Sequence, residues 1–187
     1  AYSDKIPILS KKCALPDGSI IWDIETERPH NQKTAKMVFN NILNYCKNSK
    51  MSNPEDIGSQ FYYLEKTVSA LSQKVKKIDV VIMPMHVNIL EILKLAERWE
   101  DFEIWKRHLA KITWKQKTLA NNPNIKIWDF ANINKYTDEP MLDGKKMKYF
   151  SDSNHFRPIL GEEIIEAIQS NKNQIGQELT PENIDTW

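Results

Sequence analysis

Residues 78–84 read IDVVIMP, a short and almost uninterrupted run of apolar side chains. A β-branched run of this length is typical of a β-strand that is buried on both faces. Residues 124–130, NIKIWDF, have the same character and predict a second buried strand. The two segments therefore predict a sheet that lies inside the domain.

Amphipathic segments flank and separate these two strands. Their apolar residues recur at spacings of three and four, as on one face of a helix. The clearest stripe follows a helix-start signal at Asn53-Pro54 and runs from Ile57 to Val75. Helices are predicted near residues 34–47, 54–75, 88–98, 101–120 and 158–168, with one more short helix near 179–183.

The alternation of helices and strands predicts a parallel sheet with crossover helices. We expect one domain, residues 1–187, with the three-layer parallel-sheet architecture of flavodoxin-like α/β proteins. Residues 1–30 are predicted to be irregular, except that 19–22 form either a strand or an extended loop. Residues 170–187 are predicted to be a polar tail. Two strands are few for such a sheet.

Composition excludes several classes of partner. The net charge of +1 gives no overall field that would attract nucleic acid. No apolar run reaches the roughly 18 residues of a membrane span, and the first residues lack the pattern of a signal peptide. Cys13 and Cys46 form no metal motif, and they either pair in an oxidising compartment or remain free.

Polar residues follow both predicted strands. His86 and Asn88 come soon after the first strand, and Asp129 closes the second. A polar loop then leads to Asp152 and His155. Because α/β sheets bind ligands beyond the carboxyl ends of their strands, we expect these residues to surround the functional site.

Asp152 and His155 are spaced so that, on a turn that enters a helix, the carboxylate accepts a hydrogen bond from the imidazole. Such a bond selects one tautomer and leaves the other ring nitrogen to take a proton from a nucleophile. A loop histidine that is merely capped by a nearby acid has the same spacing. The sequence predicts the pair and leaves its role open.

Residues 149–161, YFSDSNHFRPILG, resemble the C-terminal block of SGNH (GDSL-like) hydrolases and acyltransferases, in which Asp-x-x-His supplies two members of a catalytic triad. The resemblance extends back through residues 127–130 and 80–86, and it is strongest to envelope-associated bacterial members. It implies that Asp152 orients His155 and that His155 is the general base. It also implies a serine esterase or O-acyltransferase that acts on an ester of a glycan or other envelope component, in the periplasm or envelope, without a cofactor.

The serine of that family is missing from the pattern. The chain has five glycines, and none forms a Gly-Asp-Ser-like block after a first strand. Ser19 precedes a strand and Ser3 lies near the terminus, so neither suits the role. Set against the resemblance, the domain is expected to lack its N-terminal strands, which agrees with the shortage of strands. We therefore expect the serine to come from a missing N-terminal segment or from a partner chain.

The remaining site residues have two interpretations each. Asn88 either donates to an oxyanion or caps the next helix. His86 either lines the crevice or bonds to backbone at a helix entry. A zinc site from His86, His155 and Asp152 or Asp129 is the alternative to a site without metal, which we favour.

The alternative to an enzyme is an inactive binding or assembly module that retains the fold. A serine near the His155 imidazole would favour the enzyme, whereas a ring buried behind Phe150 or Phe156 would favour the module. An unrelated α/β domain would be indicated if residues 83–86 and His155 lay at opposite ends of the sheet.

Overall fold

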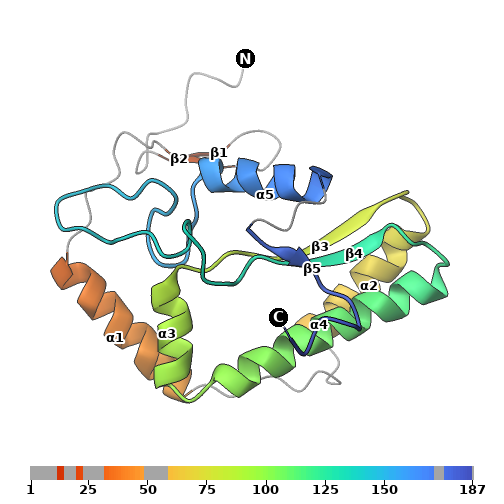
Figure 1. The fold of residues 1–187 in the computed structure, drawn as a ribbon, viewed down its shortest axis with the longest axis horizontal. Helices are drawn as coiled ribbons and strands as arrows, with labels where there is room; N and C mark the ends of the chain where they lie inside the picture. Colours follow the sequence, from red (N-terminus) through yellow and green to blue (C-terminus); the bar gives the residue numbers. More distant parts are fainter. Residues whose placement is uncertain (1–11, 15–19, 23–31, 49–58, 171–174, 187) are drawn as a thin grey trace.

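The computed structural model describes residues 12–14, 20–22, 32–48, 59–170 and 175–186. Over these residues the chain is a mixed α/β protein, as predicted (Figure 1). Its elements are β1 (Lys12–Ala14), β2 (Ile20–Trp22), α1 (Gln32–Asn48), α2 (Gln60–Ser72), β3 (Ile78–Ile82), α3 (Val87–Leu95), α4 (Trp99–Leu119), β4 (Ile125–Asp129), α5 (Pro158–Ser170) and β5 (Gln177–Glu178).

The central sheet has the strand order β3-β4-β5. β3 and β4 are the two predicted strands, and they pair in parallel from Ile78 opposite Ile125 to Ile82 opposite Asp129. β5 runs antiparallel to β4, so the expectation of an all-parallel sheet was wrong. The two residues of β5 are polar. They join the sheet through backbone pairing with β4 and not through an apolar pattern of their own.

Two predicted irregular regions contain ordered structure. β1 and β2 pair antiparallel, which corrects the irregular assignment of residues 1–30 and confirms a strand within 19–22. The supposed polar tail holds β5 and contributes Ile175 and Leu179 to the core. Residues 181–186 form consecutive turns instead of the short helix expected near 179–183.

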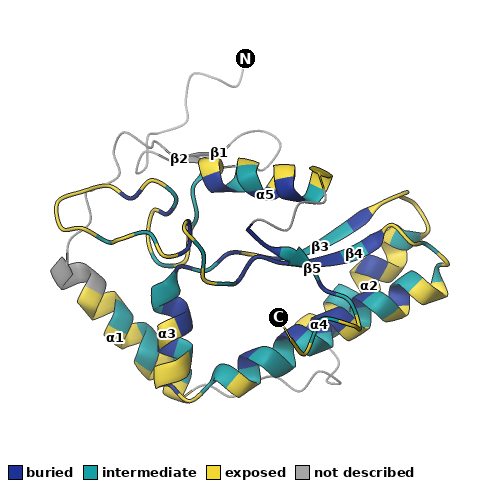
Figure 2. Cartoon of the chain, viewed as in Figure 1, coloured by how far each residue is buried: buried dark blue, intermediate teal, exposed yellow. Residues whose placement is uncertain are grey.

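Helices cover both faces of the sheet (Figure 1). Ile127 packs with Phe61 of α2 and Leu109 of α4 on one face. Its neighbour Trp128 packs with Leu160 and Ile164 of α5 on the other. Because side chains of a strand alternate in direction, β4 contributes to both cores. Figure 2 shows the buried residues concentrated on β4 and on the helix sides that face it.

The long stripe predicted on the second helix is only partly buried. α2 begins after the N-cap Ser59, whose side chain accepts a hydrogen bond from the Tyr62 amide at 3.2 Å. The Asn53-Pro54 signal lies outside the described residues. Leu71 and Val75, at the end of the stripe, are each 40% exposed, and the helix ends before Val75 is reached.

α1 packs beside α3, away from the sheet (Figure 1). Arg98 Nε, at the start of α4, donates to the Cys46 carbonyl at 3.1 Å and ties the end of α1 to this region. Cys46 is a free thiol, and burial raises its pKa; Cys13 has no described side chain. None of the described helices combines the length and apolar character that crossing a membrane requires.

Candidate functional site

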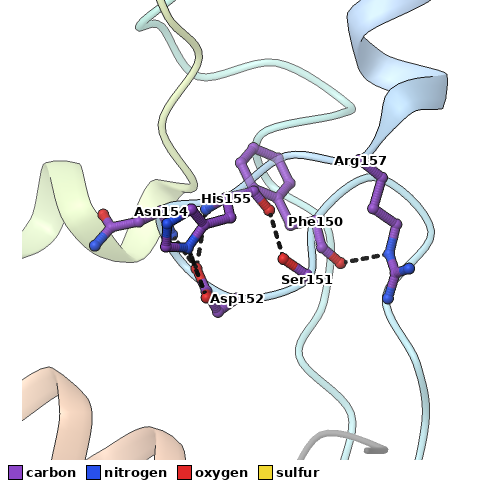
Figure 3. A network of polar contacts seen from close by, with 6 residues as sticks. All are labelled: Phe150, Ser151, Asp152, Asn154, His155 and Arg157. Carbon is purple, nitrogen blue, oxygen red and sulfur yellow. Dashed lines mark hydrogen bonds and ion pairs between the residues drawn. The ribbon is translucent and has the colours of Figure 1, made fainter. Parts of the chain in front are cut away.

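The segment 149–157 forms a tight hairpin that leads directly into α5 (Figure 3). Phe150 and Phe156 form an antiparallel bridge. The Ser151 amide donates to the His155 carbonyl at 2.8 Å, and the Arg157 amide donates to the Tyr149 carbonyl at 2.7 Å. Arg157 Nε adds a hydrogen bond to the Phe150 carbonyl at 2.9 Å. These bonds hold the turn between residues 151 and 155 in one shape.

Asp152 organises that turn. Its Oδ1 accepts hydrogen bonds from the amides of Asn154, at 2.7 Å, and His155, at 2.9 Å. The same carboxylate lies 2.9 Å (Oδ1) and 2.8 Å (Oδ2) from Nδ1 of the His155 ring (Figure 3). Because a carboxylate only accepts, Nδ1 carries a proton, and the tautomer compatible with this bond has its lone pair on Nε2.

The His155 ring is open to solvent. Its side chain is 74% exposed and that of Asp152 is 55% exposed. Phe150 is fully buried and packs against His86, so the aromatic neighbours do not enclose His155. Within the described part of the chain, no hydroxyl group bonds to Nε2. Ser3 and Ser19, which the sequence disfavoured as nucleophiles, lie outside the described residues.

His86 is a buried residue that packs against Phe150 of the hairpin. It is 2% exposed and is the N-cap of α3, with Nδ1 accepting from the Asn88 amide at 3.2 Å. Nε2 lies 2.7 Å from the Glu139 carbonyl and donates to it, and the ring stands edge-on to Phe150. Both ring nitrogens are therefore hydrogen-bonded. His86 is thus a helix-entry residue that bonds to backbone, and it does not line an open crevice.

Asn88 lies in the first turn of α3, two positions after the residue that caps the helix. Its backbone amide is used by His86, so His86 and not Asn88 is the cap. Its side-chain Nδ2 contacts Sδ of Met141 at 3.3 Å. The side-chain amide of Asn88, which was the candidate oxyanion donor, therefore contacts the loop that carries Met141.

The loops after β3 and before α5 meet at one end of the sheet. The His86 amide donates to the Ser153 carbonyl at 3.3 Å, and the Val87 amide donates to the Thr137 carbonyl at 2.8 Å. Residues 83–86 and His155 therefore do not lie at opposite ends, which was the arrangement expected of an unrelated α/β domain. The backbone of His86 thus contacts the hairpin that carries Asp152 and His155, while the His86 ring is buried and the His155 ring is exposed.

Glu139 fixes the strand-like segment that enters the hairpin. Its carboxylate accepts hydrogen bonds from the backbone amides of Lys148 and, at 2.8 Å, Tyr149. A hydrogen bond with the Tyr149 side chain raises the pKa of the Lys148 ammonium, and the charges near Lys148 raise this pKa further. Glu139 thus holds both His86, through its carbonyl, and the start of the hairpin, through its carboxylate. Sequence reasoning missed this residue because its partners are distant backbone groups.

A buried ion pair, also missed by the sequence, lies at the end of β4. Nζ of Lys106 on α4 is 3.1 Å from Oδ2 of Asp129 and 3.2 Å from Oε1 of Glu103. The side chain of Asp129 is fully buried, and its Oδ1 accepts the Ala131 amide at 2.8 Å. Asp129 is therefore a buried core residue whose two carboxylate oxygens both have partners. Within the described residues, no three histidine, cysteine, aspartate or glutamate side chains are grouped as metal ligands.

A cleft of about 460 Å³ opens beside this ion pair, between α3, α4 and residues 131–134. Its lining is mostly apolar, with Trp99 at one wall, and Glu103, Lys106 and two asparagines add polar groups. Asp152 and His155 are not part of it. The carboxyl end of β4 thus borders a hollow that is separate from the exposed imidazole.

Replacing His86 with alanine is expected to lower the free energy of unfolding by about 3 kcal/mol. The variant loses an N-cap, leaves the Glu139 carbonyl without its donor and removes an aromatic contact with Phe150. His86→Asn keeps a cap acceptor and should recover about 1 kcal/mol of this loss. Urea unfolding of the three proteins measures the effect. A loss below about 0.5 kcal/mol for alanine would contradict the supporting role.

Comparison with known proteins found no matching family model, no matching curated protein and no matching solved structure.

Proposed function

We propose that this chain is the C-terminal part of an SGNH-like serine esterase or O-acyltransferase with a flavodoxin-like three-layer fold. The observation that carries the proposal is the geometry of Asp152 and His155. Nδ1 is held by both carboxylate oxygens, while the opposite ring nitrogen faces solvent at the end of a tight hairpin. An orienting acid and a general base need this arrangement.

The chemistry requires a serine outside the described residues. Nε2 of His155 would take the serine proton as the oxygen attacks an ester carbonyl, and Asp152 would stabilise the resulting imidazolium. The imidazolium would then protonate the leaving alcohol, which yields an acyl-enzyme. Water or an acceptor hydroxyl, deprotonated by the same imidazole, would complete hydrolysis or acyl transfer. No step requires a cofactor.

The substrate and the location follow from the resemblance of residues 149–161. We propose an ester of a glycan or another envelope component as the substrate, and the periplasm or envelope as the site of action. The serine would reach Nε2 from a preceding segment of the full-length protein or from a partner chain. The exposure of the ring is what such an incoming nucleophile needs.

Labelling with a fluorophosphonate probe tests the proposal, because the probe forms a covalent bond only with an activated serine. The full-length protein should be labelled, and labelling should disappear in His155→Ala. Asn154→Ala is the matched control, since this exposed neighbour contributes only its backbone amide to Asp152. Labelling of the 187-residue chain alone would place the serine within it and overturn the external source.

A binding or assembly module is the second candidate, because no hydroxyl among the described residues contacts Nε2. In that case Asp152 would serve only to shape the hairpin through its backbone hydrogen bonds. A folded full-length protein that the probe does not label would favour the module and refute the hydrolase.

A further inference from the structure

The cleft beside the carboxyl end of β4 is bounded by one face from each of two helices. On α4, Trp99, Glu103 and Lys106 follow one another at spacings of four and three, so their side chains share one face. Leu90 and Lys94, four residues apart on α3, line the cleft from that helix. The two helices meet at an angle near Trp99 (Figure 1). The volume of about 460 Å³ lies within the range of small-molecule sites, roughly 300–1,000 Å³.

The loop that follows β4 forms the third side of the cleft, and its asparagine side chains are used within the protein. Nδ2 of Asn134 donates to Oδ1 of Asn132 at 2.8 Å and to the Ile175 carbonyl at 3.2 Å. Oδ1 of Asn134 accepts the amides of Tyr136, at 2.8 Å, and Thr137, at 3.2 Å. Nδ2 of Asn132 also donates to the Ile175 carbonyl, at 3.2 Å. The two asparagines therefore fix the shape of the loop.

Lys106 brings a hydrogen-bond donor to the lining. Its ammonium carries three N–H groups, and its side chain is only 7% exposed. Two N–H groups are accounted for by Oδ2 of Asp129 at 3.1 Å and Oε1 of Glu103 at 3.2 Å. The Phe102 ring, whose centroid is 4.8 Å from Nζ, attracts the charge but offers no oxygen. Among the described residues, no further oxygen accepts the third N–H, and a buried donor gains from a partner.

Glu103 brings an acceptor to the same place. Its side chain is 19% exposed, and its Oε1 pairs with Lys106. Within the part of the chain that the structure describes, no group donates to its Oε2. A donor and an acceptor therefore lie side by side in the lining. A hydroxyl group both accepts and donates, so one hydroxyl of a ligand can satisfy Lys106 and Glu103 together.

The charges around this point favour a ligand without charge. An anion that bonded to Lys106 would lie beside the carboxylates of Glu103 and Asp129, and a cation that bonded to Glu103 would lie beside the ammonium of Lys106. Like charges this close repel strongly where water is scarce. The rest of the lining is mostly apolar and includes the Trp99 indole, against which an aromatic ring packs favourably.

We propose that this cleft binds a small, uncharged aromatic alcohol, with its ring against Trp99 and its hydroxyl between Nζ of Lys106 and Oε2 of Glu103. The hydroxyl accepts the third N–H of Lys106 and donates to Glu103. Neither Asp152 nor His155 lines the cleft, so binding there does not depend on the proposed hydrolase function.

A series of small probes, followed by amide NMR, tests the proposal on the unaltered 187-residue chain. p-Cresol, which is uncharged at neutral pH, should shift the amide signals of Ala131 and Ile133. The shifts should saturate with a dissociation constant on the order of 1 mM. p-Methylanisole cannot donate and p-toluate is an anion, so each should bind about tenfold more weakly. Shifts that do not saturate at these two amides, or equal binding of p-toluate and p-cresol, would overturn the proposal.

A matched pair of tryptophan variants tests where the ring lies. Trp99 and Trp105 are both half-buried on α4, and each has its ring centroid 5.8 Å from that of Phe102, but only Trp99 lines the cleft. Trp99→Leu should weaken p-cresol binding about fivefold, whereas Trp105→Leu should leave it unchanged. Equal affinities in the two variants would overturn the proposal. Melting temperatures check that both variants fold, and the probe series decides by itself if Trp99→Leu does not.

Discussion

Under the proposed hydrolase function, replacing Asp152 with asparagine is expected to slow ester hydrolysis about 10⁴-fold. Asparagine keeps an oxygen for the amides of Asn154 and His155, so the hairpin should retain its shape. Its amide nitrogen, however, donates a hydrogen bond where the carboxylate accepted one. The imidazole would then place its proton on Nε2, the nitrogen that would accept the serine proton in the proposed mechanism.

The rate of hydrolysis of p-nitrophenyl acetate measures this effect, with the melting temperature as a check on the fold. Asp138→Asn is the matched control, because Asp138 is an exposed acid whose amide bonds to the Asn134 carbonyl, outside the hairpin. The control should hydrolyse the ester at the rate of the parent protein. An Asp152→Asn variant with unchanged melting and an unchanged rate would show that the carboxylate only shapes the turn.

Replacing Lys106 with methionine is expected to lower the free energy of unfolding by about 3–5 kcal/mol, because the fully buried Asp129 carboxylate would lose its cation. For a chain of this size the melting temperature should fall by roughly 10 °C. Methionine preserves the length of the side chain, so the change reports the charge more than the packing. Thermal unfolding followed by circular dichroism measures it.

Two variants complete this experiment. Lys115→Met breaks a pair with Glu65 in which the lysine is 60% exposed, and it should cost about 1 kcal/mol or less. The double variant Lys106→Met/Asp129→Asn removes both charges and should recover part of the loss of the single variant. If Lys106→Met and Lys115→Met cost the same, the buried pair contributes no more than a surface pair.

Local pattern was sufficient to predict several elements. The two apolar runs correspond to β3 and β4, which pair in parallel. A strand that is buried on both faces needs apolar residues throughout, so its composition alone indicates it. The helical stripes at 88–98, 101–120 and 158–168 correspond to α3, α4 and α5 within a few residues. The spacing of apolar residues indicates which face of a helix or strand is buried, even when the elements that pack against that face are not known.

Other features depend on partners that are distant in the chain. β5 is polar and only two residues long, so its pairing with β4 left no trace in the pattern. The His86 ring, which caps α3, also bonds to the distant Glu139 carbonyl and packs against Phe150. Sequence spacing also suggested that the α2 stripe would be buried up to Val75, but no described element covers its end.

The pairing of Asp152 with His155 was determined by the sequence alone, because a carboxylate reaches the amides and the ring two and three residues ahead within a single turn. Only the tertiary structure decided where that pair lies, what supports it and which groups are left open. The contacts of His86 with Ser153 and of Lys106 with Asp129 join segments that are far apart in the chain. Their energies come from burial and long-range hydrogen bonds, which exist only once the elements have packed.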